Sequence, residues 1–200
     1  MSSLTSREAI RSHYGEPSSG AVRKQLDRLD RHARAFIALS PFMVIASADG
    51  AGNCDATPRG DGPGFVAVVD EHTLLIPDRP GNNRVDTLLN LAENPRLGLL
   101  FFVPGLIETL RVNGQAQITL EAEALALLAH DGKPPRAAIR LTVEECFFHC
   151  GKALIRSGLW ADRPRPEFPR FGQVLADQIA GIDAEATEDR LQDAYRNRLY

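Results

Sequence analysis

The chain of 200 residues is 44% hydrophobic and 24% charged, and this balance predicts a single folded domain, residues 1–200, instead of a disordered chain. The formal net charge of -3 at pH 7 leaves no basic surplus for non-specific binding to nucleic acid, so we expect no nucleic-acid partner. No segment approaches the roughly 20 apolar residues of a membrane span, and the first residues lack a signal-peptide core, which predicts a cytoplasmic protein without a membrane partner.

The N-terminal part predicts one long helix followed by a hairpin. Apolar residues recur at helical spacing over about 20–39, and Ser40-Pro41 ends the pattern. The apolar run 42–47 predicts a strand, which a turn connects to a second strand at 54–59. The residues on the predicted helical face are Val22, Leu26, Leu29, Ala33, Phe36 and Ile37.

The rest of the chain alternates between strand patterns and short helices. Apolar runs predict strands at 65–69, 73–77, 96–103, 109–119 and 137–150. Helical spacing predicts helices at 83–93 and 121–129, and a C-terminal helical extension over about 172–200. The helices are too few for parallel crossovers, so we expect a mainly β fold, an antiparallel β-barrel of about six strands with peripheral helices and a core at about 40–160.

Two neighbouring stretches, Asp55 to Asp61 and Pro77 to Arg84, combine cations, amides and turn residues. Phosphate is bound by guanidinium and amide donors at the start of a helix, and Asn82 and Asn83 lie where the helix at 83–93 should begin. A single arginine near a turn is usually a solvated surface group, but the grouping predicts an anion site. Its candidate residues are Arg59, Arg79, Asn82, Asn83 and Arg84.

Pro58 lies inside a predicted strand, where proline is tolerated at an edge, at an end or at a bulge. The backbone groups freed there can face a ligand. Alternatively, Pro58 simply ends the strand and Asp61 caps the following turn. The residues by themselves leave both interpretations open.

A second cluster follows the last strand, where Lys152, Arg156 and Trp160 recur every four residues. On a helix they share one face, which could meet a flat anionic ligand. A lone tryptophan is also typical of a core or interface anchor.

Metal binding and thiol catalysis are not indicated. Cys146, His149 and Cys150 have no second pair of ligands for a tetrahedral zinc site, and a strand would send His149 and Cys150 to opposite faces. With Cys54 the cysteines are odd in number, so we expect free thiols. There is no P-loop and no Gly-x-Ser-x-Gly elbow, and no catalytic residue is assigned.

Together the two stretches at 55–61 and 75–84, the segments 93–101 and 108–114, and residues 149–160 resemble the pyridoxamine 5'-phosphate oxidase-like flavoproteins. Within that superfamily the chain is similar to an uncharacterised bacterial FMN-dependent branch. The resemblance spans about 22–160. It implies a six-stranded antiparallel split β-barrel, a homodimer with FMN in the cleft between subunits, and oxidation or reduction of a small substrate by hydride transfer at flavin N5.

The resemblance also implies roles for individual residues. The strand around Thr57 and Arg59 lines the flavin ring, and Ile76-Pro77 lies beside the ribityl chain. The phosphate is held at Asn82 to Arg84, and Arg111 reaches the ring edge. A closing segment from the partner subunit contributes the last residues. The implied FMN-binding residues are Thr57, Arg59, Ile76, Pro77, Asn82, Asn83, Arg84, Arg111, Lys152, Arg156 and Trp160.

The chain departs from the vitamin B6 oxidases of this superfamily after Trp160. Those enzymes have an Arg-Leu-His substrate clamp there, whereas this chain continues Ala-Asp-Arg-Pro with no histidine. Pyridoxine phosphate oxidation is therefore not expected, and the substrate is unidentified. Two alternatives remain: a non-catalytic flavin- or haem-binding carrier or sensor, and a deazaflavin-dependent reductase that retains no FMN.

Overall fold

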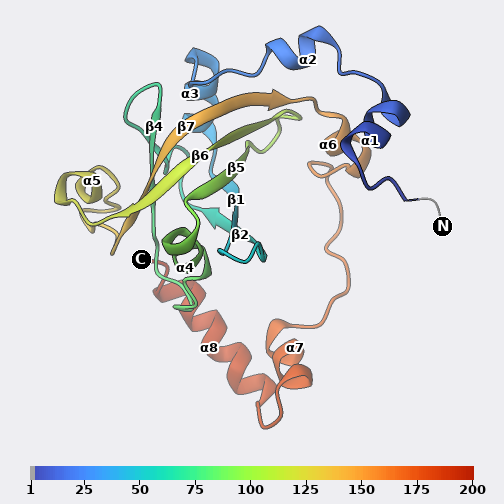
Figure 1. Ribbon diagram of the computed structural model, residues 1–200. Coiled ribbons are helices and arrows are strands. Elements are labelled where there is room, and N and C mark those ends of the chain that lie inside the picture. Colours follow the sequence, from blue (N-terminus) through green and yellow to red (C-terminus); the bar gives the residue numbers. More distant parts are fainter. Residues whose placement is uncertain (1–2) are drawn as a thin grey trace.

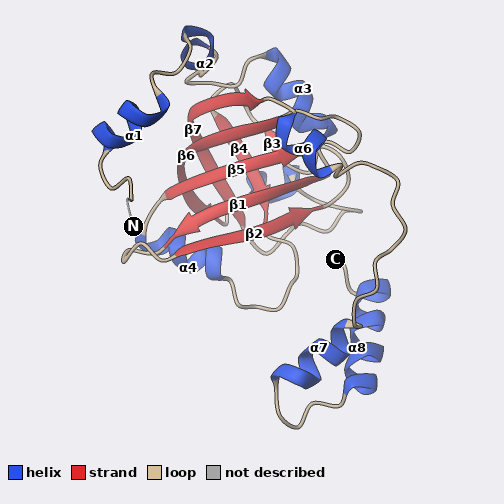
Figure 2. Cartoon of the chain, turned by 90° about the vertical axis from the view of Figure 1, so that its right-hand side faces the viewer, coloured by secondary structure: helices blue, strands red, loops and turns tan. Residues whose placement is uncertain are grey.

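The computed structural model describes residues 3–200, and its centre is one antiparallel sheet in the order β2-β1-β5-β6-β7-β4-β3 (Figures 1 and 2). The strands are β1 Phe42–Ala48, β2 Cys54–Gly60, β3 Ala67–Val68, β4 Thr73–Pro77, β5 Arg96–Phe102, β6 Thr109–Thr119 and β7 Ala138–His149. The helices are α1 Arg7–Tyr14, α2 Ser19–Arg23, α3 Arg31–Leu39, α4 Asp86–Glu93, α5 Ala122–Leu127, α6 Lys152–Ser157, α7 Phe171–Gln178 and α8 Ala184–Asn197.

The core lies on the inner face of the curved sheet and follows from strand alternation. In β1, Met43 and Ile45 are buried, and they pair with Phe101 and Leu99 on β5, which are buried too. Residues directly opposite each other on antiparallel strands share a face, so this register stacks the apolar side chains into one cluster. Helix α3 covers the cluster with Ala33, Phe36 and Ile37.

The ladder is open, but the segments that follow β2 and β4 are in contact. Among residues 3–200 no backbone pairing joins β2 to β3, the two end strands. Instead Asp61, directly after β2, accepts a hydrogen bond from Arg79, two residues after β4, at 2.8 Å between Oδ2 and Nε. The expected six strands are therefore seven in an open ladder. The mainly β expectation holds for the central sheet and is wrong for the whole chain, because helices contain more residues than strands.

The prediction of a single helix over about 20–39 is wrong, because α2 ends at Arg23 and α3 begins at Arg31. Leu26 instead forms a β-bridge with Cys146, with N to O distances of 2.9 and 2.7 Å. The register of β4 on β7 ends at Thr142, so the backbone of Cys146 needs another partner on that side, and Leu26 provides it. Helix α3 then starts anew at Arg31, where the Asp30 carboxylate caps the N–H groups of His32 and Ala33.

A bulge between Asn113 and Gly114 shifts the register of β6 against β7. A Cβ atom on Gly114 would lie 1.9 Å from the carbonyl oxygen of Thr142. The two strand backbones can approach this closely only because residue 114 has no side chain.

The C-terminal extension expected at about 172–200 is present as a hairpin of α7 and α8, which Figure 2 shows standing apart from the sheet on a long arm. The two helices meet at Gly172, whose N–H donates to Glu188 Oε2 at 2.9 Å. No helix in the described part of the chain combines the length and hydropathy needed to cross a bilayer.

We expect Gly114→Ala to lower the free energy of unfolding by about 2 to 3 kcal/mol, because the new methyl group meets strand backbone that cannot move aside. Urea denaturation measures the change. Gly62→Ala is the matched control, since a Cβ at Gly62 meets no atom within 4 Å. Equal stability of the two variants would contradict the close approach of β6 and β7.

Candidate functional site

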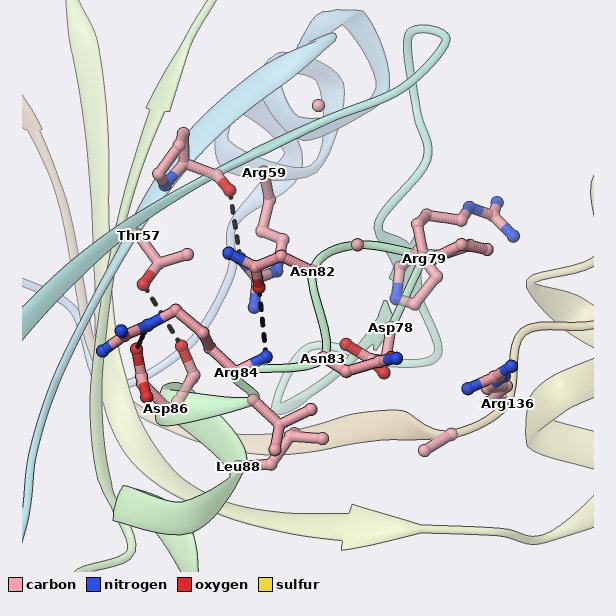
Figure 3. A pocket seen from close by; sticks show the side chains of 18 of the residues that line it. Thr57, Arg59, Asp78, Arg79, Asn82, Asn83, Arg84, Asp86, Leu88 and Arg136 are labelled. Carbon is pink, nitrogen blue, oxygen red and sulfur yellow. Dashed lines mark hydrogen bonds and ion pairs between the residues drawn. The ribbon is translucent and has the colours of Figure 1, made fainter. Parts of the chain in front are cut away.

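A cavity of about 610 Å³ lies between the inner face of β2, the loop after β4 and the start of α4 (Figure 3). Its walls come from three parts of the chain that are separate in the sequence: residues 57–60, residues 77–88, and Arg136 with Ala137 before β7. Phe65 also contributes. The cavity therefore lies between β2 and the loop after β4, two segments that no strand pairing joins.

The charged lining of this cavity is mainly cationic. Four arginines and two aspartates line it: Arg59, Arg79, Arg84, Arg136, Asp78 and Asp86. Arg79 is already paired with Asp61, and the other three arginines come from β2, from the loop before α4 and from the loop before β7. Cations that converge from separate elements produce a positive potential, and guanidinium groups suit a phosphate or carboxylate.

The loop before α4 has an unusual backbone. Asn83 has a φ of 58° and Val85 a φ of 51°, and the left-handed region is strained for a β-branched residue such as valine. Arg84 lies between them; its N–H donates to Asn82 Oδ1 at 3.1 Å, and its Nε donates to Asp86 Oδ2 at 2.8 Å. This side chain is 72% exposed, so it is available to a ligand at the mouth of the cavity.

Helix α4 begins at Asp86, three residues later than predicted, because Val85 adopts the left-handed conformation as its N-cap. Val85 makes no side-chain cap, so no cap side chain satisfies the first N–H groups of the helix. Val85 to Leu88 line the cavity. The positive end of this helix therefore adds to the arginines at the same place.

The floor of the cavity is fixed by hydroxyl groups. Thr57 Oγ1 donates to Asp55 Oδ2 at 2.8 Å, and the buried Thr87 hydroxyl lies 3.4 Å from Thr57 Oγ1. These contacts join β2 to α4.

Pro58 lies within β2 and pairs with Val44 of β1. Strand β2 is an end strand of the ladder, which is where a strand tolerates proline.

The structure brings part of the predicted site together. The predicted residues that line the cavity are Thr57, Arg59, Pro77, Asn82, Asn83 and Arg84. The others do not line it: Ile76, Arg111, Lys152, Arg156 and Trp160. Ile76 is fully buried in the core, because β4 turns it inward. Binding of FMN by any of these residues stays a prediction.

The remaining predicted residues lie around β6 and α6. The Arg111 guanidinium stands 5.3 Å from the centre of the Phe147 ring. Trp160 Nε1 donates to the carbonyl of Leu106 at 2.7 Å and so anchors the chain to the loop before β6. The prediction that Lys152, Arg156 and Trp160 share one helical face is wrong, because α6 ends at Ser157 and Gly158 adopts a left-handed backbone with a φ of 57°.

Arg136 and Asp78 line the cavity although the sequence analysis did not name them as site residues. Arg136 reaches the cavity from the loop before β7, far along the chain, and only its neighbouring prolines marked a turn there. Asp78 directly follows the predicted Pro77 and faces Arg59 and Arg136.

Burial raises the pKa of the Asp78 carboxyl above its ordinary value, and this effect outweighs the opposing attraction of Arg59 and Arg136. An acid whose pKa is raised by folding favours the protonated form in the folded state. Its charge therefore lowers stability above the ordinary pKa of aspartate, and this loss disappears as the pH falls below that value.

We expect Asp78→Asn to raise the free energy of unfolding at pH 7 and to have a smaller effect at pH 4, since the amide removes a charge that the folded state disfavours. Urea denaturation at both pH values measures this difference. Destabilisation of equal size at both values would show that the Asp78 charge is not disfavoured by folding.

The cysteines are unpaired: Cys146 is buried, and Cys54 and Cys150 are exposed. Burial raises the pKa of the Cys146 thiol to about 12, so it is not a reactive thiolate at neutral pH. Within residues 3–200 no group of three or more His, Cys, Asp or Glu side chains is placed to hold a metal ion.

Comparison with known proteins gives a family and a fold. The family model described as pyridoxamine 5'-phosphate oxidase matches residues 29–150. The crystal structure of HupZ from Group A Streptococcus is 19% identical, with a TM-score of 0.50 over 60% of this chain and 92% of HupZ. A single-site variant of HupZ is 18% identical, with a TM-score of 0.51 over 60% of this chain and 99% of that chain.

A protein from Lactobacillus delbrueckii, described as a putative pyridoxamine 5'-phosphate oxidase, is 19% identical, with a TM-score of 0.48 over 62% of this chain and 98% of that one. The curated proteins contain no significant match. At these identities the HupZ structures support the fold of the sheet and nothing about its ligand.

Proposed function

The chain belongs to the pyridoxamine 5'-phosphate oxidase family, and we propose that it binds FMN in the cavity beside β2 and acts as an FMN-dependent oxidoreductase on a small substrate. One observation carries this proposal: Arg59, Arg84 and Arg136 line a single cavity together with Asn82 and Asn83. Guanidinium and amide donors beside the start of a helix are the groups that hold a phosphate.

The cavity suits a flavin nucleotide better than haem. Its volume of about 610 Å³ lies within the roughly 300 to 1,000 Å³ of small-molecule and cofactor sites. Among the described residues, its lining includes no His, Cys, Met or Tyr, the side chains that ligate haem iron. This donor set favours FMN over the haem-binding alternative.

When bound, FMN supplies hydride transfer, and the protein supplies binding, orientation and charge. Asn82, Asn83, Arg84 and the first N–H groups of α4 would hold the phosphate. Arg59 on the inner face of β2 places a positive charge along the wall that Thr57 also forms, and such a charge stabilises negative charge that develops beside it.

We expect Arg84→Ala to weaken FMN binding by about 1.5 to 3 kcal/mol, the loss of a charge-assisted hydrogen bond. Asp86→Asn should strengthen binding, because it removes a negative charge and frees Arg84 from its ion pair. Fluorescence titration of FMN into the flavin-free protein measures both. Arg198→Ala is the matched control, since Arg198 forms a similar exposed ion pair with Asp193 at 2.9 Å.

Unchanged FMN affinity in Arg84→Ala would remove that residue from the site. The oxidoreductase assignment is tested separately, by anaerobic addition of NADH or NADPH to the purified protein while its visible spectrum is recorded. Bleaching followed by turnover with an acceptor is the expected result. A haem Soret band, or a protein that retains no FMN, would contradict the proposal and favour the haem or deazaflavin alternative.

We further propose a homodimer formed through the outer face of the sheet. Phe42 is 41% exposed there, and it pairs across the ladder with Phe102, at 6.0 Å between ring centres. Val44 and Leu100 form the next pair on the same face. A contiguous apolar surface of this kind is typical of a protein interface, and Arg111 of β6, which pairs with Leu100, lies on the same face.

Phe42→Asp should convert the dimer to a monomer in sedimentation velocity experiments, because association would bury an unpaired charge. If the partner subunit completes the cofactor site, FMN is released with the subunits. Leu120→Asp, on an exposed residue outside this ladder face, serves as the control. A monomeric wild-type protein that keeps FMN would contradict the shared site.

A further inference from the structure

Beside the main cavity, Asp61, Arg79 and His130 surround one side chain from the far end of the chain, Tyr200. These three residues are called the Tyr200 site. The Asp61 side chain is 3% exposed and that of Arg79 is 17% exposed. Tyr200 reaches them from the end of α8, which Figures 1 and 2 show returning toward the sheet after the detached hairpin.

Each part of the Tyr200 phenol has its own partner. The hydroxyl donates to Asp61 Oδ1 at 2.6 Å. The ring lies parallel to the His130 ring, at 3.8 Å between centres and 2° between planes. The Arg79 guanidinium is 5.6 Å from the centre of the same ring. A flat ring with one hydrogen-bond donor at its edge fits these three contacts.

The negative charge of Asp61 also requires that its partner be a hydrogen-bond donor. Burial by itself would raise the pKa of Asp61, but the hydrogen bonds from Tyr200, the Gly62 N–H and Arg79 more than offset it and hold this pKa below its ordinary value. Asp61 is therefore a carboxylate at neutral pH and accepts hydrogen bonds only. The bond to Asp61 is also the largest cause that raises the pKa of Tyr200, so the phenol stays protonated.

Apart from the contacts of its ring and hydroxyl group, Tyr200 is open to solvent. It is 45% exposed, and its neighbour Leu199 is 58% exposed. Within residues 3–200, Arg198 forms hydrogen bonds only with α8, and the Tyr200 hydroxyl forms the one hydrogen bond that joins residues 198–200 to another part of the chain. The ring is therefore free to leave the site without unfolding the sheet.

The space around the site is suited to a ligand. A cavity of about 190 Å³ adjoins it and is lined by Asp61, Arg79 and His130 together with Leu128. Phe65 and Arg79 line both this cavity and the main one. A molecule that displaced Tyr200 would thus have room beyond the position of the phenol and would lie beside the main cavity.

We propose that Asp61, Arg79 and His130 form a binding site for a planar aromatic ligand that carries a hydroxyl group, and that Tyr200 occupies this site in competition with the ligand. The stacked ring requires a flat partner, and the Asp61 carboxylate requires a donor. The positive charge of Arg79 beside the ring excludes a cationic ligand, because like charges repel. This inference does not depend on FMN binding, since it concerns a separate pocket and a different ligand class.

The test uses the full chain and p-cresol as the probe, which has the ring and hydroxyl of tyrosine. Calorimetry and the ring signals of His130 in NMR spectra report binding. Tyr200→Ala should bind p-cresol about tenfold more tightly than the wild type, which corresponds to a site that Tyr200 fills about nine-tenths of the time. Tyr195→Ala, on an exposed tyrosine of α8, should match the wild type.

Two further measurements sharpen the outcome. In Tyr200→Ala, toluene should bind more weakly than p-cresol, because it gives Asp61 no donor. His130→Ala combined with Tyr200→Ala should lose affinity for p-cresol while keeping its melting temperature. Equal p-cresol affinity in the wild type and Tyr200→Ala, binding without effect on His130, or no binding to either protein would overturn the proposal.

Discussion

The ion pair between Asp61 and Arg79 is the contact on which the arrangement of the site depends. It joins the residue after β2, an end strand of the ladder, to the loop after β4, the strand next to the other end. With Asp61 almost fully buried, separating the pair would leave an uncompensated charge, which is strongly unfavourable. The sheet is thus held in its curved form by side chains at a place where no strand pairing holds it.

The cavity is a consequence of that closure. Where two strands pair, side chains and backbone fill the space between them, but β2 and the loop after β4 approach without pairing and leave room for a ligand. Asn83 and Val85, whose backbone is strained, line the same gap. Arg59, Arg84 and Arg136 line it too, although packing of the core does not require arginines there. Such features lower stability and are typical of binding segments.

The sequence predicted the elements that neighbouring residues determine, and it failed for those that depend on contacts between distant residues. The strands 73–77 and 109–119 were predicted with their observed bounds, because alternation and flanking turns suffice. The helix over 20–39 failed because Leu26 satisfies the backbone of Cys146, a partner that no local pattern reveals. Asn82, Asn83 and Arg84 reach the cavity with Thr57 and Arg59, as the two motifs indicated, whereas Arg136 arrives there only through the path of β7.

The sequence by itself determined the family, the antiparallel sheet and the two motifs that form most of the cavity wall, because these depend on residue types at short spacing. Only the tertiary structure decided that the ladder stays open, that Ile76 faces the core, that Arg111 and Trp160 lie away from the cavity, and that Tyr200 returns to Asp61. Each of these depends on contacts between residues far apart in the chain, and such contacts are set by the packing and curvature of the whole sheet.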